Sequence, residues 1–166
     1  YDQIIRLEDR HLSLNLSQIW TDCITFNRLA HDLDLKNNKA SLQYALNHYL
    51  GSFLEGETSH WVLNYREQLR THYKNMVEWL GYLLENEKDW KSSVDCYSRA
   101  LEKEPLVEFF YYRLMHSYIQ LNRPSDALAT YHRCRLILLS RLGISPTQET
   151  QDLYHQLKNN ATSDKV

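Results

Sequence analysis

The segment VEWLGYLLENEKDWKSSVDCYSRALEKEP, residues 77–105, contains two runs of apolar residues at helical spacing on either side of a polar turn. Residues of the same size class return 34 positions later, as in the pairs Leu80/Leu114, Ser93/Ala127, Tyr97/Tyr131, Arg99/Arg133 and Ala100/Cys134. Small residues at such positions let two antiparallel helices approach closely, and the tyrosines fill the gap to the next pair. We therefore predict a stack of repeated helix pairs.

The low content of turn-forming residues extends this prediction to the rest of the chain. Four Gly and three Pro occur among 166 residues, where average usage would give about 20. We predict an all-α, right-handed stack of about seven antiparallel helices. The expected helices cover about 22–34, 38–50, 58–86, a segment after Asp89, 105–121, 124–141 and a segment that begins near Pro146 with Ser145 as its cap.

A different pattern precedes these helices. Residues 4–15 alternate apolar and polar side chains on both sides of Glu8-Asp9-Arg10. This alternation is typical of a short β-hairpin. A lone hairpin is marginally stable in water, so we expect it to pack against a partner element.

The overall composition excludes several classes of protein. Hydrophobic residues make up 43% and charged residues 24% of the chain, and the formal net charge is −2, which disfavours disorder and an overall nucleic-acid-binding charge. No apolar run reaches the roughly 18 to 20 residues of a membrane span. Three cysteines without Cys-x-x-Cys spacing favour reduced thiols and a cytoplasmic location. The start at Tyr1 is interpreted as that of a fragment of a longer protein.

The 34-residue spacing resembles the tetratricopeptide repeat, with its pattern W-x2-L-G-x2-Y, then A-x3-F, then P. The first copy matches this pattern at Leu80-Gly81, Tyr97, Ala100 and Pro105. It departs from the pattern at Val77 and Leu84, where the family prefers aromatic residues. The second copy restores aromatic residues at Tyr111 and Tyr118 but lacks the glycine and the closing proline.

A more specific resemblance covers about residues 20–157. Its phrases are WTDCITFNRL at 20–29, LQYALNHYLGSFL at 42–54, EPLVEFFYYRLMHSY at 104–118 and ALATYHRCRLILLSRLGISPTQETQDLYHQL at 127–157. They resemble the bacterial transcriptional activation domain, the tetratricopeptide-like effector domain of Streptomyces antibiotic regulatory protein-type regulators. The resemblance implies that such a domain occupies residues 21–158, that residues 1–20 are the trailing wing of a truncated winged-helix domain, and that 159–166 form a frayed tail.

The resemblance also implies a function. We expect a protein-interaction domain of a transcriptional activator, which contacts itself (as a homodimer), RNA polymerase or a sensor domain in the same chain. DNA binding would come only from the missing upstream winged-helix domain. The alternative is a stand-alone tetratricopeptide scaffold that binds a peptide or partner helix in its concave groove.

The groove of such a stack is lined by the first helix of each repeat. The positions expected to face it are Asn75, Glu78, Tyr82, Glu85, Phe109, Tyr112, His116 and Ile119. Phe109 and Tyr112 are residue types that anchor interfaces. The same aromatic positions also suit internal packing, against the long helix at 58–86 or the last helix.

Two basic segments are candidates for contact with DNA. Arg6, Arg10 and His11 could touch the DNA backbone if the hairpin is a wing. Segment 122–141 carries four arginines against a single aspartate, a charge that could meet the DNA backbone or an acidic partner. The alternative is that these cations near the C-terminal end of a helix only interact with the helix dipole and with water.

The sequence contains no arrangement that predicts an enzyme. The eight histidines are scattered, and none forms an H-E-x-x-H motif or a pair at spacing four. Glycine-rich phosphate loops and nucleophile elbows are also absent from the sequence. We therefore expect no catalytic, cofactor-binding or metal-binding residues.

Overall fold

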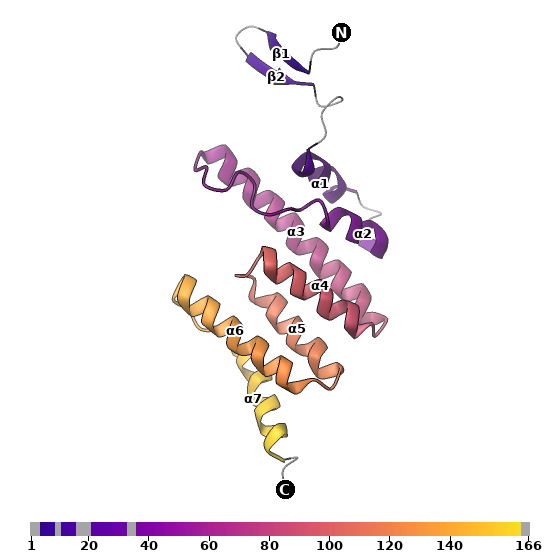
Figure 1. The fold of residues 1–166 in the computed structure, drawn as a ribbon, viewed down its shortest axis with the longest axis vertical. Helices are drawn as coiled ribbons and strands as arrows, with labels where there is room; N and C mark the ends of the chain where they lie inside the picture. The colour runs from indigo at the N-terminus through magenta and orange to yellow at the C-terminus, as the bar shows by residue number, and fades with distance from the viewer. Residues whose placement is uncertain (1–3, 9–10, 16–20, 33–35, 164–166) are drawn as a thin grey trace. The chain divides into compact units, whose positions relative to one another are not determined.

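The computed structural model describes residues 4–8, 11–15, 21–32 and 36–163. Seven α-helices lie within these ranges, which confirms the all-helical prediction for this part of the chain (Figure 1). The chain divides into two compact units, Tyr1–Met76 and Val77–Val166, with the division inside α3. The helices are α1 (Asp22–Ala30), α2 (Lys39–Leu46), α3 (His60–Asn86), α4 (Trp90–Lys103), α5 (Glu108–Gln120), α6 (Pro124–Leu142) and α7 (Gln148–Ser163).

The first unit begins with two four-residue strands. Strands β1 (Ile5–Glu8) and β2 (His11–Leu14) pair antiparallel, with Ile5 opposite Leu14 and Glu8 opposite His11. Residues 9 and 10, where the predicted turn would lie, are outside the described residues. The turn and its role as a wing therefore stay predictions.

Helices α1 and α2 form the core of the first unit with the part of α3 that ends at Met76. Thr21 and Asn38 cap the two short helices by accepting hydrogen bonds from the backbone N–H of Ile24 and Ser41. Both helices end about four residues earlier than the periodicity predicts, at Ala30 and Leu46. The core itself is made of fully or nearly fully buried side chains: Phe26, Leu42, Ala45, Tyr49, Val62, Leu69, Tyr73 and Met76.

The loop between α2 and α3 is tied to α3 by one arginine. The Arg66 guanidinium donates to the backbone carbonyls of Phe53, Leu54 and Glu57. Gly51 and Gly56 have φ values of 151° and 89°, so the second of them adopts a backbone conformation that other residues rarely take.

In the second unit, consecutive helices from α4 to α7 pack against one another, and the end of α3 packs on α4 (Figure 1). A β-carbon built on Gly81 would overlap the hydroxyl and Cζ of Tyr97. Glycine is therefore required there by the closeness of α3 and α4. This glycine belongs to the Leu80-Gly81 pair that matches the tetratricopeptide pattern.

Some helix ends of the second unit lie where the sequence predicts them, and others do not. Asp89 caps α4, Pro124 lies in the first turn of α6, and Gly143 ends α6 with a left-handed φ of 69°. Pro105, predicted to start a helix, instead lies in a turn three residues before α5.

The predicted cap of the last helix is also wrong. The carbonyl of Thr147, not that of Ser145, accepts the first helical hydrogen bond of α7, from Gln151. The Glu108 carboxylate explains the shift, because it accepts hydrogen bonds at 2.7 Å from both the backbone N–H and the hydroxyl of Thr147. α7 then runs to Ser163, into the segment 159–166 for which fraying stays a prediction.

Candidate functional site

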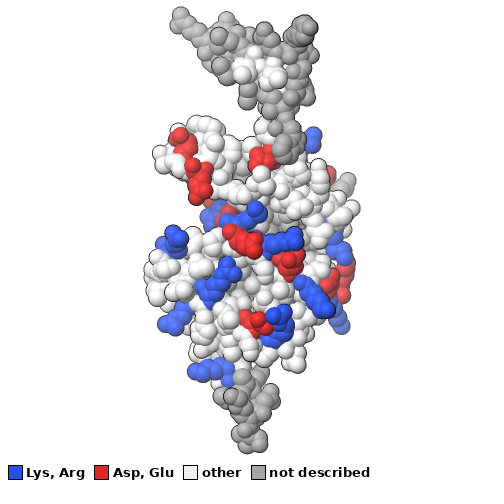
Figure 2. Space-filling view, in the orientation of Figure 1, with Lys and Arg blue, Asp and Glu red and all other residues white. Residues whose placement is uncertain are grey.

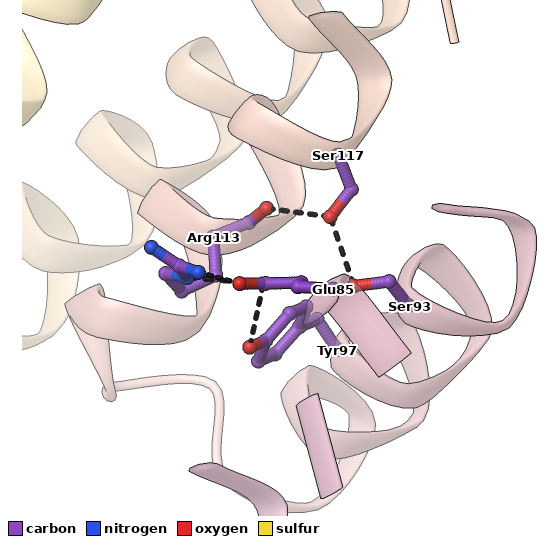
Figure 3. A network of polar contacts seen from close by, with 5 residues as sticks. All are labelled: Glu85, Ser93, Tyr97, Arg113 and Ser117. Carbon is purple, nitrogen blue, oxygen red and sulfur yellow. Dashed lines mark hydrogen bonds and ion pairs between the residues drawn. The ribbon is translucent and has the colours of Figure 1, made fainter. Parts of the chain in front are cut away.

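A buried carboxylate organises the contact between α3, α4 and α5. The Glu85 side chain on α3 is 8% exposed. Its Oε1 accepts hydrogen bonds at 3.0 Å from the Tyr97 hydroxyl and from Nε of Arg113, and its Oε2 forms an ion pair with the same guanidinium (Figure 3). The two-point contact with Arg113 offsets the cost of removing the Glu85 charge from water.

Two serines continue this network between α4 and α5. Ser93 and Ser117 are both fully buried, and their hydroxyl oxygens lie 3.1 Å apart (Figure 3). The Ser117 hydroxyl donates to the carbonyl of Arg113 at 2.9 Å. Because that bond uses the Ser117 proton, Ser93 is the donor to Ser117. The backbone of Arg113 is thereby tied to α4.

A pocket of about 310 Å³ opens beside this network. Four aromatic and two charged side chains line it, from α3, α4 and α5: Glu78, Trp79, Tyr82, Tyr97, Phe109 and Arg113. Tyr82 is 62% exposed and Phe109 43% exposed, so both present ring surface to solvent. The volume lies at the lower end of the range for ligand sites, about 300–1,000 Å³, and suits a single side chain better than a large molecule.

Burial changes the acid–base behaviour of the groups around the pocket. Burial raises the pKa of Tyr97, with smaller contributions from Cys96 and Glu78, so its hydroxyl keeps its proton and stays a donor to Glu85. Burial lowers the pKa of Arg113, and the Glu149 carboxylate partly opposes that shift. A guanidinium remains charged even so.

The structure brings three of the predicted groove residues together and disperses the others. Glu78, Tyr82 and Phe109 line the pocket, whereas Asn75 is exposed and belongs to the first unit. The prediction that Glu85 faces outward is wrong, because Arg113 and Tyr97 hold its carboxylate inside.

The remaining predicted residues lie further along α5. The Tyr112 hydroxyl hydrogen-bonds with Glu149, and its pKa is raised by burial and by that carboxylate. His116 lies edge-on to Trp90 at 5.8 Å between ring centroids, and its pKa is lowered by burial and by Arg113. Ile119 packs against the core cluster that contains Met115 and Leu157. Internal packing, the alternative left open for these positions, thus accounts for part of the set.

Sequence reasoning missed Trp79, Tyr97 and Arg113 as site residues. Tyr97 is predicted to fill the gap between helix pairs, and its ring does so while its hydroxyl reaches the pocket network. A usable indication for Arg113 existed. It lies one helical turn after Phe109 on the same face of α5, and a carboxylate next to the buried Leu84 near the end of α3 calls for such a cation.

The family model of the bacterial transcriptional activator domain matches residues 24–158. The chain belongs to this family. The resemblance drawn from the sequence phrases is therefore confirmed, and it makes the chain an effector domain of a transcriptional activator. No curated protein sequence matches the chain.

A solved structure supports the fold of this bacterial transcriptional activator domain. The chain is similar to the C-terminal TPR-containing domain of a protein from Plasmodium falciparum assigned as an FK506-binding protein, with a TM-score of 0.55 and 12% sequence identity. The match covers 88% of this chain and 96% of the other. At this identity the likeness establishes the tetratricopeptide-like fold alone.

The predicted DNA-contacting residues of the domain stay predictions. Arg10 lies outside the described residues, and Arg6 and His11 are described only as members of β1 and β2. Arg123, the residue just before the arginine-rich helix α6, forms an ion pair with Asp126 at 2.8 Å. On the face drawn in Figure 2, Lys and Arg side chains are interspersed with Asp and Glu.

Metal ligands and nucleophiles are groups that many enzymes use. Among the described residues, no three His, Cys, Asp or Glu side chains are grouped so as to hold a metal ion. Burial raises the pKa values of the Cys96 and Cys134 thiols to about 12, which suppresses the thiolate form that acts as a nucleophile. No helix within the described ranges is long and apolar enough to cross a membrane.

Proposed function

We propose that this chain is the interaction domain of a bacterial transcription activator and works by protein–protein contact while a winged-helix domain upstream binds the DNA. The family match over residues 24–158 is the observation that supports this most strongly. In this proposal the domain occupies residues 21–158 and acts in the cytoplasm. Its contact is with a second copy, with RNA polymerase or with a sensor domain in the same chain.

The pocket on α3 and α5 supports a contact made by a protruding side chain. Exposed aromatic rings at a concave site are the residue type that most often dominates binding energy. Tyr82 and Phe109 satisfy this description, and the network of Glu85 and Arg113 holds α3 and α5, the helices that carry them, at a fixed spacing. A site held in place before binding loses less conformational entropy when the partner arrives.

A stand-alone scaffold is the second candidate, favoured by the structural likeness to a TPR-containing domain. Such a scaffold would use the same pocket to hold a peptide, without stimulating transcription. The two candidates therefore differ in the consequence of binding and not in the place where binding occurs.

A transcription assay separates these candidates. The full 166-residue chain is fused to a heterologous DNA-binding domain and placed at a reporter promoter in a Streptomyces host. The proposed function predicts reporter expression well above that given by the DNA-binding domain alone. Expression equal to that control, with normal accumulation of a folded fusion protein, would overturn it and favour the scaffold.

A further inference from the structure

The C-terminal part of α6 presents an uncovered apolar surface. Four large apolar side chains are each about half exposed or more, at 67%, 53%, 50% and 49%: Leu136, Leu139, Leu142 and Ile144. Helix α7 packs against an earlier part of α6, where Tyr154 stacks on Tyr131 with 4.1 Å between the ring centroids. Neighbouring exposed apolar side chains of this kind mark an interaction site on a protein surface.

The leucines of α6 form a stripe that two arginines flank. Leu136, Leu139 and Leu142 follow one another at spacings of three residues, which places them on one side of the helix. Arg133 precedes Leu136 by three residues, and Arg135 precedes Leu139 by four. Each of these exposed arginines therefore lies one helical turn from a leucine of the stripe.

The stripe lies on a positively charged stretch of the helix. Residues 127–142 contain Arg133, Arg135 and Arg141 but no Asp or Glu. None of these three arginines forms an ion pair within the described part of the chain. The Arg133 guanidinium lies 6.0 Å from the centroid of the Tyr111 ring, a contact that leaves its charge without a carboxylate.

The carboxylates of the two helices that pack against α6 have other partners. Helices α5 and α7 carry three of them among their described residues. Glu108 accepts two hydrogen bonds from Thr147, Glu149 hydrogen-bonds with Tyr112, and Asp152 accepts a hydrogen bond from a glutamine of its own helix. The arginines beside the stripe are therefore available to an outside carboxylate.

From this arrangement we infer that the leucine stripe of α6 binds an acidic amphipathic helix of a partner protein. The apolar side chains of such a helix would cover the leucines, and its carboxylates would meet Arg133 and Arg135 at the edges. DNA would leave the leucines uncovered, and a second copy of α6 would bring like charges together. The six residues that line the pocket lie on other helices, so this surface goes beyond the proposed function.

A designed peptide tests the surface without knowledge of the partner. The probe is a peptide of about 15 residues, built of leucine, alanine and glutamate with all leucines on one helical face. In one comparison peptide lysine replaces glutamate, and in another the leucines are distributed around the helix. Each is titrated into the isotope-labelled full chain. We expect saturable shifts at the methyl groups of Leu136 and Leu139 with the probe, and binding weaker by about fivefold or more with both comparison peptides.

Two pairs of replacements examine the role of charge. Arg133→Gln/Arg135→Gln keeps the leucines and should weaken binding of the probe by about fivefold to tenfold. Arg28→Gln/Arg99→Gln, which removes two exposed arginines of α1 and α4, is the matched control and should leave binding unchanged. Equal effects of the two pairs, or tighter binding of the lysine peptide, would overturn the inference.

The leucines have a test of their own. Leu136→Ala/Leu139→Ala should abolish saturable binding of the probe and keep the circular dichroism spectrum, since both side chains are exposed. Unchanged binding to this variant would overturn the inference, as would self-association of the chain that the same replacements abolish. The proposed function assigns activation to the pocket, so the leucine variant should still activate the reporter, and failure of either proposal leaves the other standing.

Discussion

Arg113 on α5 engages both oxygens of the buried Glu85 carboxylate on α3, and it is the only Lys or Arg that an ion pair joins to Glu85 in the described part of the chain. Replacing Arg113 by Met would leave that charge buried without its cation. Loss of one partner of a buried pair costs about 3–5 kcal/mol, and because Arg113 is 27% exposed we expect about 2–3 kcal/mol of unfolding free energy.

Urea unfolding measures this loss. The double variant Glu85→Gln/Arg113→Met should recover at least half of it, since no unpaired charge remains. Arg99→Met provides the matched control, because its partner Asp95 is a surface residue. A loss below about 0.5 kcal/mol for Arg113→Met would show that the pair does not hold α3 against α5.

The close approach of Gly81 and Tyr97 gives a second prediction. Alanine in place of glycine normally favours a helix by about 1 kcal/mol, but here its β-carbon would overlap the Tyr97 hydroxyl. Overpacking of this kind costs about 1–3 kcal/mol, so Gly81→Ala should lower the urea midpoint. Lys91→Ala, on the exposed face of α4, should change it little. A midpoint raised by Gly81→Ala would contradict the close packing of α3 and α4.

The two buried serines should behave as one unit. Ser117→Ala leaves the Ser93 hydroxyl buried without its acceptor, at a cost of about 1–2 kcal/mol. Removing both hydroxyls should cost less than the sum of the two single replacements. A double-mutant cycle in urea tests this, with the exposed Ser140→Ala as the control. Strict additivity of the two replacements would show that the hydroxyls do not interact.

Two half-buried histidines predict a loss of stability in acid. Burial lowers the pKa of His72, with His31 adding to the effect, and burial with Arg113 lowers that of His116. Because these pKa values lie below those of the unfolded chain, the unfolded state binds more protons as pH falls through about 6.5. Stability is therefore fully present above that pH and declines below it.

The measurement is the urea midpoint between pH 8 and pH 5. Replacing His72 and His116 by Gln should reduce the decline, while replacing the exposed His132 by Gln should not. An unchanged decline in the His72/His116 variant would assign the acid sensitivity to other groups.

An element could be predicted from the sequence where its local pattern and its tertiary contacts favour the same structure. Asp89 and Pro124 each act where the sequence predicts, because each acts on the helix end next to it. Phrases that resemble the activator family also identified the domain correctly.

Where the prediction failed, a distant residue had changed the local outcome. Thr147 replaced Ser145 as the cap because Glu108, 39 residues away, binds it. Glu85 lies inside because Arg113, 28 residues away, neutralises it. Helical periodicity places a side chain on a face but carries no information about such a partner, so the pocket could be predicted only in part.

We propose that this domain activates transcription through the pocket on α3 and α5, and reporter activation by pocket variants tests this proposal most directly. Tyr82→Ala/Phe109→Ala removes two exposed rings of the lining, and Leu136→Ala/Leu139→Ala removes two exposed side chains of α6 in the same unit. Both fusions are checked for unchanged helical content by circular dichroism. We predict that activation is lost with the pocket pair and retained with the α6 pair; retention with the pocket pair would contradict the claim.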